Sequence, residues 1–391
     1  MGMQPVDASA LTFSLVRDPF FRLQRALRLV PRQGMGSLRR AVFFALLAWV
    51  PIAVWAYLRD RLLPGVAPEP LLSHFAVNVR CLLAIPLLVL SDSLAESVLG
   101  PLVPRFAEMG LVPADRVKNL SEVVGGMNRL RDRKLAWLLI AGVVALATLT
   151  GDVRAQQVDI LNWAVGEGGL GFGGWWFLLV ARPLFLGLLL AWSWRLFLVI
   201  VLFRRIAALD LRLKPQHPDR AGGLGFVEPV PWGFAFVNLA LSSVIASHIA
   251  HEILYHGAHV ASLKAFFVVT IVLLALVALA PLLAFMGPLM RAKARARIEY
   301  GKLAGHHASE VHARWVEGKT VEDEAILMAP ELGASADVEA LYTCATGMRA
   351  LPLGKSSLLA ALIPAALPML VAASVEVPIK QILLKILGTV A

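Results

Sequence analysis

The chain has 391 residues, of which 58% are hydrophobic and 16% are charged, with a formal net charge of +10 and a mean hydropathy of +0.71. Soluble domains usually carry about 25% charged residues, so this composition excludes an ordinary soluble enzyme, a disordered regulator and a disulfide-rich secreted domain. The two cysteines, Cys81 and Cys344, are too few for a disulfide framework. We therefore expect an all-α integral membrane protein.

Seven apolar segments are close to the roughly 20 residues that a helix needs to cross a bilayer. None alternates polar and apolar residues as a strand would, and a helix satisfies its backbone groups within the segment. Several segments contain prolines, which kink helices. The sequence predicts about seven transmembrane helices, with six plus a re-entrant C-terminal segment as the alternative. They cover residues 41–58, 71–90, 134–150, 174–203, 230–250, 266–290 and 357–375.

The basic residues are distributed unevenly between the two sides of this arrangement. Of the 37 Lys and Arg residues, 28 fall on the side of the N-terminus, which predicts a cytoplasmic N-terminus. Because these charges mark one membrane face, we expect no nucleic-acid partner. Four regions follow from the pattern: a basic cytoplasmic segment at 1–40, a six-helix membrane region at 41–290 with a cytoplasmic glycine-rich loop at 204–229, a cytoplasmic helical segment at 291–356, and a seventh span with an amphipathic tail at 357–391.

Residues 11–30 show the pattern of an amphipathic helix. At 100° per residue, Val16 and Phe20 fall on one side, whereas Arg17 and Arg25 fall on the other. A helix of this kind lies in the membrane interface with its arginines on anionic headgroups. We expect it to serve as an interfacial anchor, with anionic lipids of the cytoplasmic leaflet as its partners.

Three arginines, Arg80, Arg182 and Arg195, fall inside predicted spans, and no Asp or Glu lies in the middle of any span. A charge at the centre of a span costs roughly 2.5 kcal/mol or more, so it should face a partner, water or a substrate. Cationic side chains without acidic partners favour an anionic permeant. The alternative is that Arg195 extends to the interface and Arg80 binds helix-end carbonyls.

The loop before the fifth predicted span is rich in proline and glycine. Exposed amides of a glycine turn that leads into a helix can hold an anion, here with an arginine beside them. The alternative is a structured turn that caps the following helix. The candidate residues of this loop are His217, Asp219, Arg220, Gly222, Gly223 and Gly225.

The stretch His-Pro-Asp-Arg-Ala-Gly-Gly-Leu at 217–224 has two companions, Ala-Asp-Val-Glu-Ala-Leu-Tyr at 336–342 and Met-Arg-Ala-Leu-Pro at 348–352. With them, the chain resembles a group of bacterial multi-pass membrane proteins of uncharacterised function. The resemblance implies a bacterial cytoplasmic membrane protein and carries over no activity. The Asp-Val-Glu stretch departs from the Asp-Ile-Gln-Ser pattern of that group, so no role is transferred to it.

Histidines gather at the outer end of the fifth predicted span. His248, Glu252 and His256 recur at i, i+4 on one helix face, which could supply ligands for zinc or copper or sense pH. A complete metal site would require ligands from elsewhere, and a polar helix end is the simpler interpretation. No cofactor is required by any other feature of the sequence.

These features favour a membrane transport protein, a channel or transporter, with anions preferred over cations and homo-oligomers expected. One alternative is a membrane-embedded enzyme or lipid-handling protein that binds a phosphate headgroup at the glycine loop. Another is a non-catalytic sensor or assembly partner. No nucleophile-elbow, kinase or zincin motif occurs, so no catalytic residue is assigned.

Overall fold

A computed structural model describes residues 11–31, 34–63, 70–150, 162–166, 169–255, 257–321, 327 and 335–376. In this described part, the strands are β1 (Val165–Gly166) and β2 (Gly169–Leu170), which form a two-residue antiparallel pair, and the rest is helical or loop. The predicted amphipathic tail, residues 377–391, lies outside the described residues. In chain order the helices are α1 (Pro19–Ala26), α2 (Ser37–Leu58), α3 (Phe75–Val79), α4 (Ile85–Leu99), α5 (Leu102–Glu108), α6 (Val117–Arg131), α7 (Lys134–Leu149), α9 (Phe172–Trp176), α10 (Arg182–Ala207), α11 (Ala235–Tyr255), α12 (Val260–Leu279), α13 (Met286–Trp315), α15 (Ser335–Thr346) and α16 (Lys355–Ala373).

Six helical stretches in the described part of the chain are long and apolar enough to cross a membrane. This fits an all-α, multi-pass membrane protein. The C-terminal stretch has 19 residues, long enough to cross a membrane. The stretches are Ser37–Leu58, Phe75–Glu108, Phe172–Ala207, Gly225–Tyr255, Val260–Trp315 and Lys355–Ala373.

Helix α7 corresponds to the third predicted span, and its length sets it apart. It has 16 residues, about 24 Å at the helical rise, which is less than the ~30 Å of a hydrocarbon core. None of its residues is buried, and it packs on α10. The predicted count of seven spans is therefore matched by six helices of sufficient length and one shorter apolar helix.

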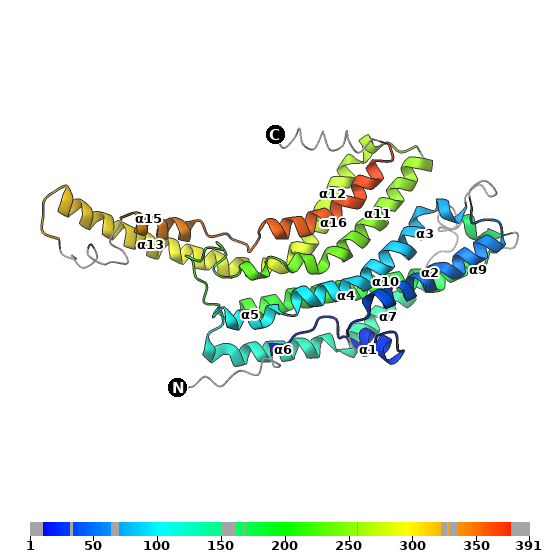
Figure 1. Cartoon of the computed structure of the whole chain (residues 1–391), viewed down its shortest axis with the longest axis horizontal. Coiled ribbons are helices and arrows are strands. Elements are labelled where there is room, and N and C mark those ends of the chain that lie inside the picture. Colours follow the sequence, from blue (N-terminus) through cyan, green and yellow to red (C-terminus); the bar gives the residue numbers. More distant parts are fainter. Residues whose placement is uncertain are drawn as a thin grey trace.

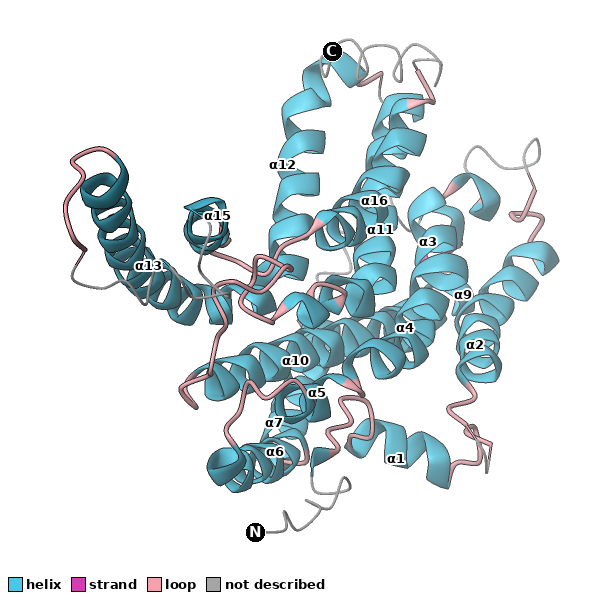
Figure 2. Cartoon of the chain, turned by 60° about the vertical axis from the view of Figure 1, so that its left-hand side comes forward, coloured by secondary structure: helices cyan, strands magenta, loops and turns pink. Residues whose placement is uncertain are grey.

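The helices form two groups that meet along α4 and α11 (Figure 1). One group contains α2, α4 and α10, with α1, α6 and α7 beside it. The other contains α11, α12 and α16, which pack on one another (Figures 1 and 2). Helix α13 continues the chain of α12 away from these groups, and α15 packs along it, so this pair projects from one end of the molecule (Figure 1).

Two π-helical turns interrupt long helices. The turn η3 (Arg80–Ala84) joins α3 to α4, and η6 (Phe177–Ala181) joins α9 to α10. Each turn ends shortly before a proline, Pro86 or Pro183. A proline has no N–H and its ring clashes with the carbonyl four residues earlier, which here lies within the π turn. The local widening of both helices thus has its cause in the sequence.

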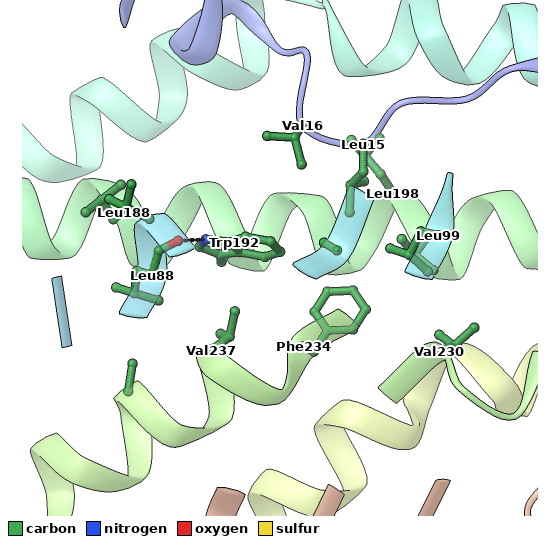
Figure 3. Packing of buried hydrophobic residues seen from close by; sticks show 14 of the residues in the cluster. Leu15, Val16, Leu88, Leu99, Leu188, Trp192, Leu198, Val230, Phe234 and Val237 are labelled. Atoms are coloured by element: carbon green, nitrogen blue, oxygen red, sulfur yellow. Dashed lines mark hydrogen bonds between the residues drawn. The ribbon is translucent and has the colours of Figure 1, made fainter. Parts of the chain in front are cut away.

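The N-terminal segment does not form the long helix that the sequence predicts over residues 11–30. Asp18 accepts a hydrogen bond from the backbone N–H of Phe21 and caps α1, which is only eight residues long. The preceding residues are extended, and Leu15 and Val16 are buried in the core (Figure 3). The segment is consequently part of the protein interior as well as a surface element. Leu23, which belongs to the predicted apolar face, lies in α1 and is exposed.

Figure 3 shows the core where the two groups of helices meet. Trp192 of α10 is buried, and its indole Nε1 donates to the backbone carbonyl of Leu88 in α4 at 2.8 Å. Its ring meets Phe234 edge to face at 6.0 Å. An aromatic side chain with its polar atom satisfied can bury a large apolar area, which fixes the spacing of α4, α10 and the start of α11.

Candidate functional site

The three arginines predicted at membrane depth have different surroundings. Arg195, in α10, is 2% exposed and pairs with two carboxylates. Its Nε and Nη2 donate to Asp18 Oδ2 at 2.9 and 2.6 Å, and its Nη1 donates to Asp92 Oδ1 at 2.7 Å. The expectation that this arginine lacks acidic partners is wrong. Asp18 lies in the N-terminal segment and Asp92 lies two residues past the second predicted span, so folding brings both to Arg195 from outside the spans.

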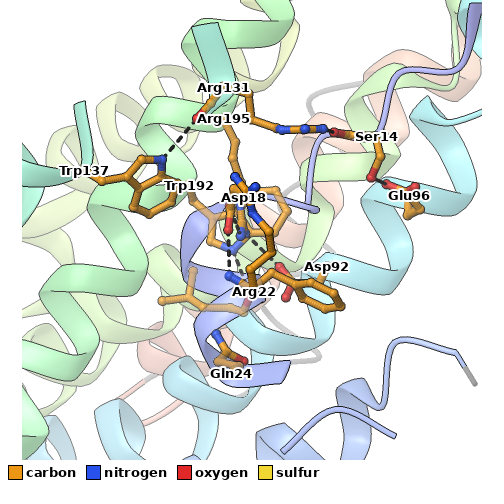
Figure 4. A network of polar contacts seen from close by, with 12 residues as sticks. Ser14, Asp18, Arg22, Gln24, Asp92, Glu96, Arg131, Trp137, Trp192 and Arg195 are labelled. Carbon is orange, nitrogen blue, oxygen red and sulfur yellow. Dashed lines mark hydrogen bonds and ion pairs between the residues drawn. The ribbon is translucent and has the colours of Figure 1, made fainter. Parts of the chain in front are cut away.

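The ion pairs continue to a second arginine, which the sequence analysis did not single out. Arg40, in the first turn of α2, donates from Nη2 to Asp92 Oδ2 at 2.7 Å and from Nη1 to Gln24 Oε1 at 2.8 Å. Figure 4 shows Asp18, Asp92 and Arg195 of this network. Asp18, Asp92, Arg40 and Arg195 carry two negative and two positive charges, so the cluster is neutral. We call these four residues the buried ion cluster.

The buried ion cluster joins four separate parts of the chain: the N-terminal segment, α2, α4 and α10. Both arginines also lie against aromatic rings, Arg195 at 4.7 Å from that of Trp192 and Arg40 at 5.0 Å from that of Phe21. Such contacts favour a desolvated cation. Every carboxylate of the cluster accepts hydrogen bonds, so the arrangement holds the fold and presents no free charge to a substrate.

Arg80 is the opposite case. It begins the π turn η3, and its guanidinium carbon lies 5.6 Å from the ring centre of Phe177 and 5.5 Å from that of Phe185. Within the described residues, no carboxylate forms an ion pair with Arg80, and its buried Nε has no hydrogen-bond partner. The side chain is therefore held between two rings by cation–π contacts, with hydrogen-bonding capacity left over.

Arg182, the third predicted residue, belongs to the same region. It directly follows η6 and its positive charge repels that of Arg80. Arg182 has an interaction of its own, so it is not a free charge. The structure thus brings Arg80 and Arg182 together through the two π turns and separates both from Arg195. We take Arg80, Phe177, Phe185 and Arg182 as the candidate functional site.

The glycine loop binds an anion, but the anion belongs to the chain itself. Asp219 Oδ1 accepts from the backbone N–H groups of Ala221 (2.8 Å) and Gly223 (3.2 Å), and Oδ2 accepts from that of Gly225 (2.8 Å). Partial burial alone would raise the pKa of this carboxyl. The three amides and His217 outweigh that effect and hold the pKa below its usual value. These amides are consequently not available to a phosphate headgroup.

The same loop docks on the segment at 348–352 that carried part of the resemblance. The backbone N–H of Arg349 donates to the carbonyl of Arg220 at 2.7 Å, and the side chain of Arg349 pairs with Glu228 at 3.1 Å. Gly222 has φ +65°, and a Cβ there would lie 2.9 Å from Met348 Cε. Residues 217–228 and 348–352 therefore contact each other, and this contact connects the α13–α15 pair to the membrane helices.

The histidine stripe does not form a metal site in the part of the chain that is described. His248 is exposed and Glu252 is half-buried, while His256 lies outside the described residues. Among the described residues, no three His, Cys, Asp or Glu side chains are placed to hold a metal ion. At this end of the helices, His251 instead stacks on His74 at 5.8 Å.

No protein family, no curated protein and no solved structure matches this chain. The comparisons accordingly assign neither an activity nor a fold relative. The resemblance stated from the loop motif stays an expectation, and the functional argument depends on the arrangement of the residues themselves.

Proposed function

We propose that the chain is a membrane transport protein, a channel or transporter, in which Arg80 binds a small permeating anion. The observation that carries the proposal is the buried Arg80 Nε, which has no hydrogen-bond partner, on a guanidinium that no carboxylate pairs with among the described residues. The Nε of Arg40 is also unpaired, but Asp92 neutralises that guanidinium. A buried guanidinium normally has its donors satisfied, because an unpaired buried donor costs about 1–3 kcal/mol. A transient anion would provide that partner.

The contrast with Arg195 supports this assignment. Arg195 has two carboxylate partners and belongs to the fold, whereas Arg80 lies against the rings of Phe177 and Phe185 and pairs with no carboxylate of the described residues. Aromatic rings position a cation without neutralising its charge. A permeation site requires this balance, since an ion must bind well enough to enter and weakly enough to leave. Arg182 lies close enough to Arg80 for the two charges to interact.

The location is part of the proposal: a bacterial cytoplasmic membrane, with the N-terminus on the cytoplasmic side and α7 as a short seventh crossing. The basic asymmetry of the sequence supports this orientation. So does the path of the chain. Trp137 in the first turn of α7 stacks on Phe20 beside the N-terminal segment, whereas Trp163 packs on Trp55 near the far end of α2. These contacts support the proposed crossing at α7.

The test is ion flux into liposomes that contain the purified protein. Losing a hydrogen bond to a charged group costs about 1.5–3 kcal/mol, so Arg80→Gln should lower chloride flux by about tenfold or more. Arg80→Lys keeps the charge and should retain part of the flux with altered selectivity among anions. Arg116→Gln is the matched control, because Arg116 is exposed and pairs with the exposed Asp210.

Two results would overturn the proposal. One is cation-selective flux, or no flux at all, from folded wild-type protein. The other is chloride flux that Arg80→Gln leaves at the level of Arg116→Gln. Circular dichroism and gel filtration of each variant establish that the protein is folded before flux is compared.

A further inference from the structure

A hollow between α7 and α10 has the shape of a binding site for one lipid chain. It has a volume of about 660 Å³, within the 300–1,000 Å³ of typical ligand pockets. Trp137 and Val144 of α7, Gly187 and Leu188 of α10, and Phe20 and Leu23 of α1 contribute to its walls. These walls are almost entirely apolar, and we call the hollow the α7–α10 groove.

The length of the α7–α10 groove matches an acyl chain in one leaflet. Lining residues on α7 recur from Trp137 to Leu149, which corresponds to a rise of about 18 Å. Half of a ~30 Å hydrocarbon core is about 15 Å. A chain that enters at Trp137 would therefore reach just past the middle of the membrane before the groove ends.

Small residues create this space. A Cβ on Gly187 would meet only Val144 Cγ2, at 3.9 Å, so α7 and α10 do not close on each other there. Ala141 and Ala145 also line the groove and are exposed. No residue of α7 is buried, so the groove opens sideways to the surroundings of the helices rather than into the core.

One end of the groove is basic. Lys134 is exposed and lies one turn before Trp137 on the same face of α7. Arg22, exposed in α1, precedes Leu23 of the groove wall and pairs with Asp132 at 2.9 Å. Phe20 and Trp137 stack between the apolar and the basic part, as aromatic residues do at the headgroup level. Basic pockets between membrane helices bind anionic headgroups.

We infer that the α7–α10 groove holds one anionic phospholipid, with an acyl chain along α7 and its phosphate near Lys134 and Arg22. The groove lining includes none of the candidate-site residues Arg80, Phe177, Phe185 and Arg182, so the inference does not depend on the transport proposal. The predicted interfacial helix thereby acquires a specific role, since the short helix α1 closes the basic end of a lipid site.

Native mass spectrometry of the full-length protein in detergent tests the inference. Phosphatidylglycerol and phosphatidylcholine with identical acyl chains serve as probes. We expect wild type to retain one phosphatidylglycerol in preference to phosphatidylcholine. Gly187→Leu and Ala145→Phe fill the groove and should abolish this retention. Lys134→Gln should weaken retention of phosphatidylglycerol about fivefold and leave that of phosphatidylcholine unchanged.

Gly142→Leu is the matched control, because a Cβ at Gly142 meets nothing within 4 Å and Gly142 is not among the residues that line the groove. It should retain the lipid as wild type does. Ala145 is exposed, so Ala145→Phe gives a folded groove-filling variant even if Gly187→Leu disturbs helix packing. The inference is overturned if both groove variants retain phosphatidylglycerol, or if both lipids are retained equally. It is also overturned if groove variants change a dimer into a monomer without losing lipid, which would make this face a contact between copies.

Discussion

Replacing Asp92 by Asn is expected to destabilise the protein strongly. Asp92 is 4% exposed and accepts hydrogen bonds from both arginines of the buried ion cluster, Arg40 and Arg195, each at 2.7 Å. The substitution keeps the shape and removes the charge. The cluster then holds two positive charges and the single negative charge of Asp18, in a place from which water is excluded.

The magnitude follows from the cost of an unpaired buried charge. Removing one partner of a buried ion pair typically costs 3–5 kcal/mol, because the other charge stays desolvated and uncompensated. We expect Asp92→Asn to lower the free energy of unfolding by about this amount. Removing one arginine as well, in Asp92→Asn with Arg40→Met, makes the cluster neutral again. The double variant should therefore lose about 0.5–3 kcal/mol less than the sum of the two single variants.

The assay is a double-mutant cycle measured by denaturant unfolding of purified protein in detergent, followed by far-UV circular dichroism. Arg116→Gln, at an exposed ion pair, is the reference and should change stability by about 1 kcal/mol or less. The reasoning is refuted if Asp92→Asn costs no more than this reference. It is equally refuted if the two single effects simply add, because the charges would then not act on each other.

Two further predictions concern the glycine loop. Because the pKa of Asp219 is lowered by the fold, its contribution to stability is present above the ordinary Asp pKa of about 3.9 and is lost as pH falls through the folded pKa. The protection of residues 215–225 against hydrogen exchange, relative to the intrinsic exchange rate at each pH, should therefore fall in acid, whereas Asp219→Asn should show low protection already at pH 7 and no acid step. Gly222→Ala should cost about 1–2 kcal/mol of unfolding free energy, because φ is +65° and the new Cβ meets Met348, and Gly142→Ala on exposed α7 is the comparison that should stay neutral or gain stability.

The class of protein and most of its long helices could be predicted from the sequence, because those properties are local. A bilayer demands a long apolar run, and such a run is visible without knowing its neighbours. Six of the seven predicted segments correspond to helices long enough to cross. The third fell short because its apolar run ends at Leu149, after 16 helical residues. The capping role of Asp18 before Pro19 was also readable, as Asp followed by Pro is a common helix start.

The glycine loop shows how one sequence pattern allows two structures, a cradle for an external anion or a structured turn that caps the next helix. Asp219 precedes Gly223 and Gly225 by four and six residues, and an aspartate often binds amides that closely follow it in the chain. In the structure those amides bind Asp219. The Asp219 carboxylate binds these amides in preference to an external anion, because it belongs to the same chain and loses no translational entropy on binding.

The long apolar helices, and the arginines that fall inside them, follow from local sequence. That Asp18 and Asp92 neutralise Arg195, with Asp18 177 residues away in the chain, depends on tertiary packing, as does the contact of Arg80 with the rings of Phe177 and Phe185. Hydropathy and spacing describe how a segment partitions between water and lipid. The state of a charge depends on the groups packed against it, and packing across helices brings together residues whose separation in the chain carries no information about their distance in space.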